Sequence, residues 1–303
     1  MERESLLCIL VMLLGGLALQ PFVGWPPTVA AELPAAELPA AELERRSWRR
    51  LWYPIVPALL VAAGLCGWAL RAPDPVRDPL DPWVLLAAWL PFGLIFARAA
   101  ARGVWSLLRR PIDCGVSTVG LIRPQVVFSP FLARQLEEGV IRAALAHERA
   151  HELHRDPLRI WLAQLVTDLQ WPWPWAARRL EIWLEALELA RDDQARAAGA
   201  DGADLAAAVL GSVRYLERIA ASPGTRLTGT QLAHARLIGD AIALRKRVSR
   251  LLAPLPQRPR AAPAGLGRLR RAGLLLVPLL LVALVLGAVY GEHVVRPLLG
   301  MTS

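Results

Sequence analysis

The sequence predicts a mainly α-helical membrane protein with four transmembrane helices and one folded, mainly helical domain that carries a small β-hairpin. Three observations support this fold class. Of the 303 residues, 55% are hydrophobic, which is too apolar for an ordinary soluble domain. Four windows of about 20 residues are almost wholly apolar. Only the stretch 100–271, before the last window, is long enough for a folded domain.

The four apolar windows are residues 6–25, 51–70, 82–99 and 272–291. Each is long enough to cross a hydrocarbon core of about 30 Å as a helix, and prolines inside such helices are tolerated. The first window could instead be a cleaved signal peptide. Its leading residues, MERES, carry two acids and one base, which is a poor start for a signal peptide, so we expect a retained span.

Arginine placement sets the expected orientation. Arg45, Arg46, Arg49 and Arg50 end the linker 26–50, and arginine-rich stretches also follow the third span and precede the fourth. Since such loops stay on the cytoplasmic side, we expect a multi-pass protein of the inner (plasma) membrane. Its domains would be 1–99 with three spans, a cytoplasmic domain 100–271, and 272–303 with the fourth span and a short extracytoplasmic tail. Most of the net charge of +9 flanks the spans, which predicts contact with the lipid bilayer and no direct contact with nucleic acid.

Shorter patterns predict the elements between the spans. The repeat AELPAAELPAAELE at 31–44 is typical of a solvated linker, partly helical at best. Two β-branched runs flank GLIRP and predict a strand pair at 116–119 and 125–128. Helical patterns separated by proline and glycine breaks follow at about 133–155, 158–169, 174–198, 203–221 and 228–252. A basic, proline-rich linker, 254–265, leads back to the membrane.

The stretch AALAHERAHELHRDP at 143–157 holds three of the five histidines and is the candidate chemical site. Within it, His147, Glu148 and His151 form a His-Glu-x-x-His pattern. Helix positions four apart lie on one face about 6 Å apart, so both imidazoles can reach one zinc ion at about 2.0–2.1 Å. Glu148, roughly 100° round the helix, would face the zinc's water as a general base. The alternative is a solvated face whose glutamates offset nearby arginines, but the small apolar residues before His147 predict burial.

A catalytic zinc site needs a third protein ligand. The helix predicted at 174–198 offers Glu181, Glu185 and Glu188, and spacing alone does not decide between the last two. Glu188 and Asp192 are four apart on one face, so one could bind zinc while the other orients a ligand histidine. His154 lies on nearly the same face as the other two histidines. It could assist as a hydrogen-bond donor, or it could satisfy carbonyls at the helix C-terminus.

These motifs resemble the membrane metallopeptidases of the BlaR/MecR type, the antirepressor proteases of β-lactam sensing. The similarity runs through GLIRPQVVFSP (120–130), HERAHELHRD (147–156) and ELARDDQA (188–195), and more weakly through RKRVSRLL (245–252). It implies a zincin-like (gluzincin) domain with three zinc ligands, a catalytic base and an aspartate after the ligand glutamate. In this sequence these are His147, His151 and Glu188, then Glu148, then Asp192.

Other positions add to or depart from this resemblance. Asp156 matches the family's aspartate after the histidine motif, which implies a structural contact at a helix end. Arg191 stands where a cysteine is usual, and Trp173 precedes Pro174 where an asparagine is common. Only EHVVRPLLGMTS follows the fourth span, so we expect no penicillin-binding sensor domain, and β-lactam sensing is not implied.

The resemblance implies an integral-membrane zinc-dependent endopeptidase with a cytoplasm-facing active site. Its expected substrate is a regulatory protein in signal transduction, such as a winged-helix, DNA-binding repressor of the BlaI/MecI kind. Self-cleavage within 254–265 is a further expectation. Two alternatives stay open: an HtpX-like protease for membrane-protein quality control, and a non-catalytic membrane signalling scaffold. A neighbouring repressor gene would favour the first reading, and the intact His147, Glu148, His151 and Glu188 disfavour a scaffold.

Overall fold

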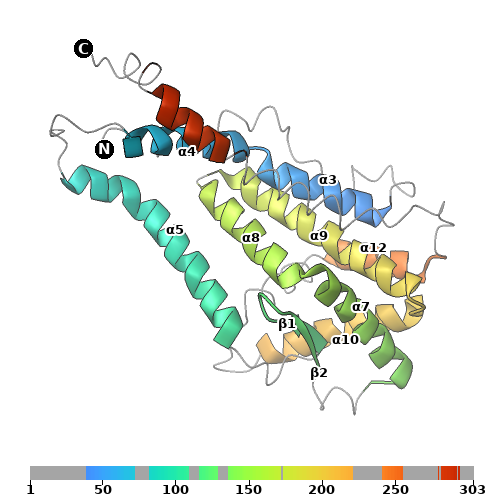
Figure 1. Cartoon of the computed structure of the whole chain (residues 1–303). Coiled ribbons are helices and arrows are strands. Elements are labelled where there is room, and N and C mark those ends of the chain that lie inside the picture. Colours follow the sequence, from blue (N-terminus) through green and yellow to red (C-terminus); the bar gives the residue numbers. More distant parts are fainter. Residues whose placement is uncertain are drawn as a thin grey trace.

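A computed structural model describes residues 39–71, 82–108, 116–128, 136–171, 173–220, 241–254 and 281–291, with the single residues 279 and 293. These residues form a mainly helical fold with one two-stranded antiparallel sheet, which confirms the mainly helical character of the expected fold and the small hairpin. Figure 1 shows a bundle of helices with the hairpin at its edge and a long helix, α5 (Pro82–Leu108), at one side.

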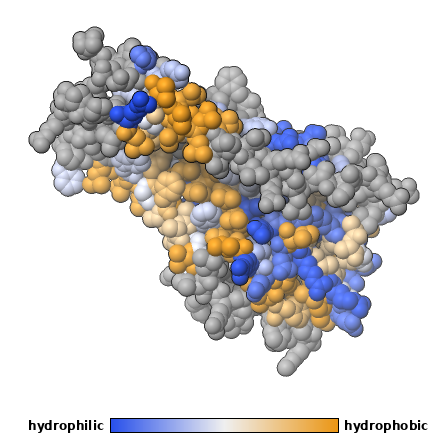
Figure 2. All heavy atoms as spheres, in the orientation of Figure 1, coloured by the Kyte–Doolittle hydropathy of each residue, from blue (hydrophilic) through white to orange (hydrophobic). Residues whose placement is uncertain are grey.

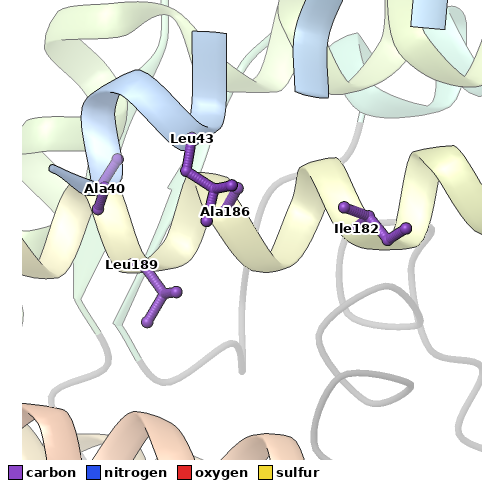
Figure 3. Close-up of a cluster of buried hydrophobic side chains, with 6 residues drawn as sticks. Ala40, Leu43, Ile182, Ala186 and Leu189 are labelled. Atoms are coloured by element: carbon purple, nitrogen blue, oxygen red, sulfur yellow. The ribbon is translucent and has the colours of Figure 1, made fainter. Parts of the chain in front are cut away.

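Helix α9 (Pro174–Ala197) is the centre of the bundle, since most of its residues from Ile182 to Ala195 are buried. Helix α3 (Ala40–Trp52) lies along it (Figure 1). Ala40 and Leu43 of α3 pack against Ile182 and Ala186 of α9 (Figure 3). Residues 40–44, the end of the expected solvated linker 31–44, therefore begin a helix whose inner face, with Ala40, Leu43 and Glu44, is buried. The apolar positions recur three or four residues apart, and this stripe is stable only when another helix covers it.

A turn at 53–55, around Pro54, separates α3 from α4 (Val56–Arg71). The helix within the expected span 51–70 therefore begins at Val56, because residues 51–52 belong to α3. Helix α4 crosses the helix at 281–291 (Figure 1) at very short range. A Cβ atom at Gly67 would lie 1.9 Å from the carbonyl oxygen of Leu284, and one at Gly287 would lie 1.7 Å from that of Gly64. Small residues that let two backbones approach this closely are typical of helix pairs in membranes.

Helix α5 (Pro82–Leu108) contains the window expected to span at 82–99 and continues beyond it. Its inner side packs on α8 (Asp156–Leu169). The indole Nε1 of Trp161 donates to the carbonyl oxygen of Ala99 at 2.8 Å, and Arg102 forms an ion pair with Asp168. An ion pair and a tryptophan hydrogen bond thus fix α5 to the bundle.

Apolar side chains cover the outer faces of α4, α5 and the helix at 281–291. On the face shown in Figure 2, hydrophobic surface gathers over this part and hydrophilic surface over the bundle. The exposed large hydrophobic residues here include Val61, Leu70, Trp83, Leu86, Trp89, Leu90, Leu94, Phe96, Val282, Val285, Leu286 and Val289.

Among the described residues, one helical stretch, 40–68, is long and apolar enough to cross a membrane. It is made of α3 and most of α4. The expected span at 6–25 lies outside the described residues, as does most of 272–280. The architecture of four spans therefore stays a prediction.

The remaining elements match the sequence-based expectations closely. Strands β1 (Val116–Val119) and β2 (Gln125–Phe128) pair antiparallel, with Val116 opposite Phe128. Gly120, with a φ of 98°, begins the connection in a conformation that disfavours other residues. Helices α7 (Glu138–His154), α10 (Gly202–Ala220) and α12 (Ala241–Leu252) complete the bundle. Helix α7 starts at Glu138, later than the expected 133, because the backbone at Glu137 is extended. The expected start near 228 and the linker 255–265 lie outside the described residues.

Candidate metal centre

The site is built where α7 meets α8 and α9. Helix α7 ends at His154 because Arg155 adopts a left-handed conformation, with φ at 52°. Helix α8 begins immediately at Asp156, with Pro157 in its first turn, where a missing backbone N–H is harmless. The connection is thus a single residue, and it returns the carboxylate of Asp156 to the last turn of α7.

Three buried side chains converge on one point. His147 and His151 come from α7 and Glu188 from α9, and each offers a ligand atom within 4.8 Å of the others. The two Nε2 atoms lie 3.0 Å apart. The carboxylate oxygens of Glu188 lie 3.4 Å from Nε2 of His147 and 3.6 Å from Nε2 of His151. Of the three glutamates that the sequence left open, Glu188 is the one brought to the histidines.

These separations fit a tetrahedral metal ion. Ligand atoms about 2.0–2.1 Å from a tetrahedral zinc lie about 3.3 Å from one another. The three observed distances of 3.0, 3.4 and 3.6 Å scatter around that value. The buried group could therefore hold a metal ion, and its two nitrogens and one oxygen are donors that zinc accepts.

The far nitrogen of His147 faces a second carboxylate. Its Nδ1 lies 2.9 Å from Oδ1 of Asp192, one turn after Glu188 on α9. Burial alone would lower the pKa of His147, but close contacts with the carboxylates of Asp192 and Glu188 raise it to about 10. A metal must displace a proton from this imidazole, so metal affinity should fall as the pH falls. Asp192 has the place expected of a residue that orients a ligand histidine.

His151 has a carboxylate partner of its own. Its Nδ1 lies 2.9 Å from Oδ2 of Asp156, which is completely buried. Two guanidiniums, from Arg191 and Arg159, donate to the same carboxylate. Burial alone would raise the pKa of Asp156, but hydrogen bonds from Arg191 and His151 hold it well below its usual range. Sequence reasoning gave Asp156 a structural helix-end role, whereas its contact with His151 also suits it to orient that ring.

Arg247 of α12 is a site residue that sequence reasoning missed. Its guanidinium donates to both carboxylate oxygens of Asp192 at 2.7 and 2.8 Å, and it lies 3.0 Å from Oε2 of Glu188. Burial alone would lower the pKa of Arg247, but the two carboxylates raise it, so it stays charged. A sequence signal for this role existed: two neighbouring acids on α9, Asp192 and Asp193, pair with two arginines three residues apart on α12, Arg247 and Arg250.

Glu148 lies beside the cluster and is held by the hairpin. The hydroxyl of Thr118, on β1, lies 2.7 Å from Oε2 of Glu148 and 2.9 Å from its carbonyl oxygen. A hydroxyl that donates to a carboxylate fixes its rotamer and leaves the second oxygen for another partner. Thr118 is a second residue that the sequence did not single out.

His154 is not brought into the cluster. Its Nδ1 lies 3.0 Å from the carbonyl oxygen of Ala150, and its Nε2 lies 3.1 Å from the amide nitrogen of Gln194. Burial and the charge of Arg191 lower its pKa, which favours a neutral ring that donates at Nδ1 and accepts at Nε2. This arrangement fits the helix-end alternative, and neither nitrogen is left for an assisting role.

Comparisons with protein-family models, with curated proteins and with solved structures found no match for this chain.

Proposed function

We propose that this protein is a membrane-embedded zinc endopeptidase of the BlaR/MecR kind, with its active site between α7 and α9. One observation carries the proposal: two histidines one helical turn apart and a glutamate from another helix converge in a buried site at separations that suit one tetrahedral ion. A buried group of this kind without a metal would be costly, because polar groups removed from water need full satisfaction.

The partners behind the ligands support the same assignment. Each histidine has a carboxylate at the nitrogen that faces away from the cluster, Asp192 for His147 and Asp156 for His151. Ligand histidines in metal sites almost always donate their second N–H to such a group, which fixes the tautomer. A solvated cluster of histidines and acids would not need a carboxylate behind each of the two histidines.

The residues divide the work as follows. Bound zinc supplies a Lewis acid that lowers the pKa of water to about 7 and polarises a peptide carbonyl. Glu148 takes a proton from the attacking water on one carboxylate oxygen and delivers it to the amine of the departing peptide. Thr118 keeps the other oxygen occupied and so orients this carboxylate. Asp192 and Asp156 hold the two rings, and Arg247 offsets part of the negative charge of Glu188 and Asp192.

The membrane assignment is supported by the apolar outer faces of α4, α5 and the helix at 281–291. Exposed apolar surface on this scale is rare on soluble monomers. Lipid contact by these faces, with the arginine-rich elements in the cytoplasm, would place the metal centre on the cytoplasmic side. A protein substrate in that compartment, such as a winged-helix repressor, fits the resemblance in the sequence.

The test uses the full chain reconstituted in liposomes with candidate repressors. We expect about one zinc per wild-type chain and cleavage of the substrate. Glu148→Gln should keep the zinc and lower the cleavage rate by about 10²- to 10⁴-fold, because it loses the proton acceptor and keeps the ligands. His147→Ala should lose both zinc and cleavage.

Glu152→Gln is the matched control, because Glu152 lies one turn further along α7 and is no member of the metal cluster. It should behave as wild type. If wild type binds no zinc, the metal site is refuted. Equal cleavage by wild type and Glu148→Gln would instead refute only the role of Glu148. Zinc binding without cleavage of any repressor, but with cleavage of unfolded membrane proteins, would favour a quality-control protease.

A further inference from the structure

Four charged groups, of which Glu44, Asp156 and Arg191 are buried and Arg159 is partly exposed, connect α3 to the metal centre. Glu44 of α3 is 5% exposed and forms an ion pair with Arg159 of α8. Its other oxygen lies 3.6 Å from Nη1 of Arg191 on α9. Both arginines donate to Asp156, which lies 2.9 Å from Nδ1 of His151. A continuous series of contacts therefore runs from a residue that precedes α4 to a candidate metal ligand.

The charges of this network balance only when Glu44 is counted. Arg159 and Arg191 supply two positive charges, and Asp156 supplies one negative charge. Glu44 supplies the second negative charge from a position where water cannot replace it. An uncompensated buried charge is strongly unfavourable, and here the excess would be positive and close to the site for a cation. Without Glu44, Arg159 and Arg191 would also interact more strongly with Asp156 and so weaken its hydrogen bond from His151.

Apolar packing of α3 fixes the position of Glu44. Leu43 packs on α9 beside it (Figure 3), and Trp48, one turn later, stacks against Trp183 with ring centroids 4.9 Å apart. The guanidinium of Arg159 lies over both tryptophan rings, at 5.1 and 5.5 Å from their centroids. Glu44 therefore reaches the arginines only while α3 is docked on α9.

We propose that Glu44 is a positioning residue for the metal centre: by neutralising Arg159 and Arg191 it lets Asp156 hold His151, so tight metal binding requires α3 to be docked. This inference rests on the proposed metal site. It means that α3, which lies between the first two expected spans, directly influences metal binding in the bundle.

The test compares zinc affinity among variants of the full chain in detergent micelles, by competition with a chromophoric chelator. Glu44→Gln should weaken zinc binding about tenfold, the lower end of the loss seen when a partner behind a metal ligand is removed. Glu42→Gln is the matched control. It lies on the same helix and pairs with the outward-facing Arg45 and Arg46, so it should bind zinc as wild type does.

Arg159→Gln separates charge balance from mere docking of α3. It breaks the same ion pair as Glu44→Gln, but it leaves an excess negative charge instead of a positive one. It also removes one of the two guanidiniums that donate to Asp156, so zinc affinity should fall less than in Glu44→Gln. If both variants weaken zinc binding equally, the pair only docks α3 and the inference is overturned.

The remaining outcomes are also decisive. Zinc binding by Glu44→Gln at wild-type affinity overturns the inference and leaves the metal site intact, whereas loss of zinc binding by the wild type would overturn the proposed function itself. Near-ultraviolet circular dichroism of the tryptophans reports whether each variant is folded. Should Glu44→Gln fail to fold, Arg159→Gln still decides, because a tenfold loss of affinity there contradicts the inference.

Discussion

Replacing Asp192 by asparagine tests the electrostatic support of the metal centre. The substitution keeps the size of the side chain and removes one charge. It replaces the carboxylate that lies 2.9 Å from Nδ1 of His147 with a neutral amide, and its single acceptor oxygen can keep at most one of the two hydrogen bonds from Arg247 at 2.7 and 2.8 Å. Glu188 remains the acid beside Arg247, at 3.0 Å, so the guanidinium keeps one partner.

The expected loss of metal affinity is 10- to 100-fold, because partners behind ligand histidines contribute about this much. This corresponds to about 1.4–2.7 kcal/mol of binding free energy. The metal-free protein should also lose stability. Burial alone would raise the pKa of Asp192, but the charge of Arg247 and the contacts with His147 and Arg247 lower it from 3.8 to about 2. A pKa difference of this size corresponds to about 2 kcal/mol of the free energy of unfolding at neutral pH.

The sign of the pH dependence follows from the lowered pKa. The contribution of Asp192 to stability is complete above pH 3.8 and is lost as the pH falls toward about 2. Wild type should therefore lose more stability than Asp192→Asn over this interval. Above pH 3.8, the titration of Asp192 should no longer change the difference between the free energies of unfolding of wild type and Asp192→Asn.

Asp193→Asn is the matched control, since Asp193 is the next residue of α9, is also buried and pairs with Arg250 of α12 at 2.9 Å. Its carboxylate pairs with Arg250, whereas the carboxylate of Asp192 faces Nδ1 of His147. Zinc affinity by chelator competition and unfolding by urea in detergent should be measured for both variants. Asp193→Asn should lose stability but bind zinc as wild type does. If the two variants lose the same zinc affinity, the role of Asp192 behind His147 is refuted.

Two further changes test other parts of the structure. Thr118→Val should lower kcat up to about tenfold without loss of zinc, because it removes the hydroxyl that orients Glu148; unchanged kcat in a cleavage assay would contradict that role. Gly67→Ala should lower the free energy of unfolding by about 1–3 kcal/mol, since its Cβ would overlap the helix at 281–291. At Gly93 on α5 a Cβ would meet nothing within 4 Å, so Gly93→Ala should leave thermal unfolding in detergent unchanged.

Local signals in the sequence predicted much of the bundle. The hairpin was placed at the residues where it occurs because β-branched runs flank a glycine that must adopt a positive φ, Gly120. Helix α9 was placed almost to the residue because Pro174 begins it and Gly199 follows its end. The His-Glu-x-x-His pattern located half of the site for the same reason, since its geometry depends on one helix alone.

Features that depend on contacts between distant segments were missed. The segment around Ala40 and Glu44 has the composition of a solvated linker, and only the presence of α9 shows that its inner face is covered. The choice of Glu188 among neighbouring glutamates depends on the rotation of α9 relative to α7, which spacing within α9 does not determine. Arg247 reaches the site from α12, so its role follows from the packing of three helices.

The glycine-lined crossing of α4 with the helix at 281–291 has a consequence for biogenesis. The contact joins Gly67 to Leu284, so it cannot form until the bundle helices that lie between them in the sequence have been synthesised. Until then α4 lacks its neighbour, although α3, which it directly follows, is already a component of the bundle. Docking of α4 on the helix at 281–291 is thus expected to follow synthesis of the bundle that separates them in the sequence.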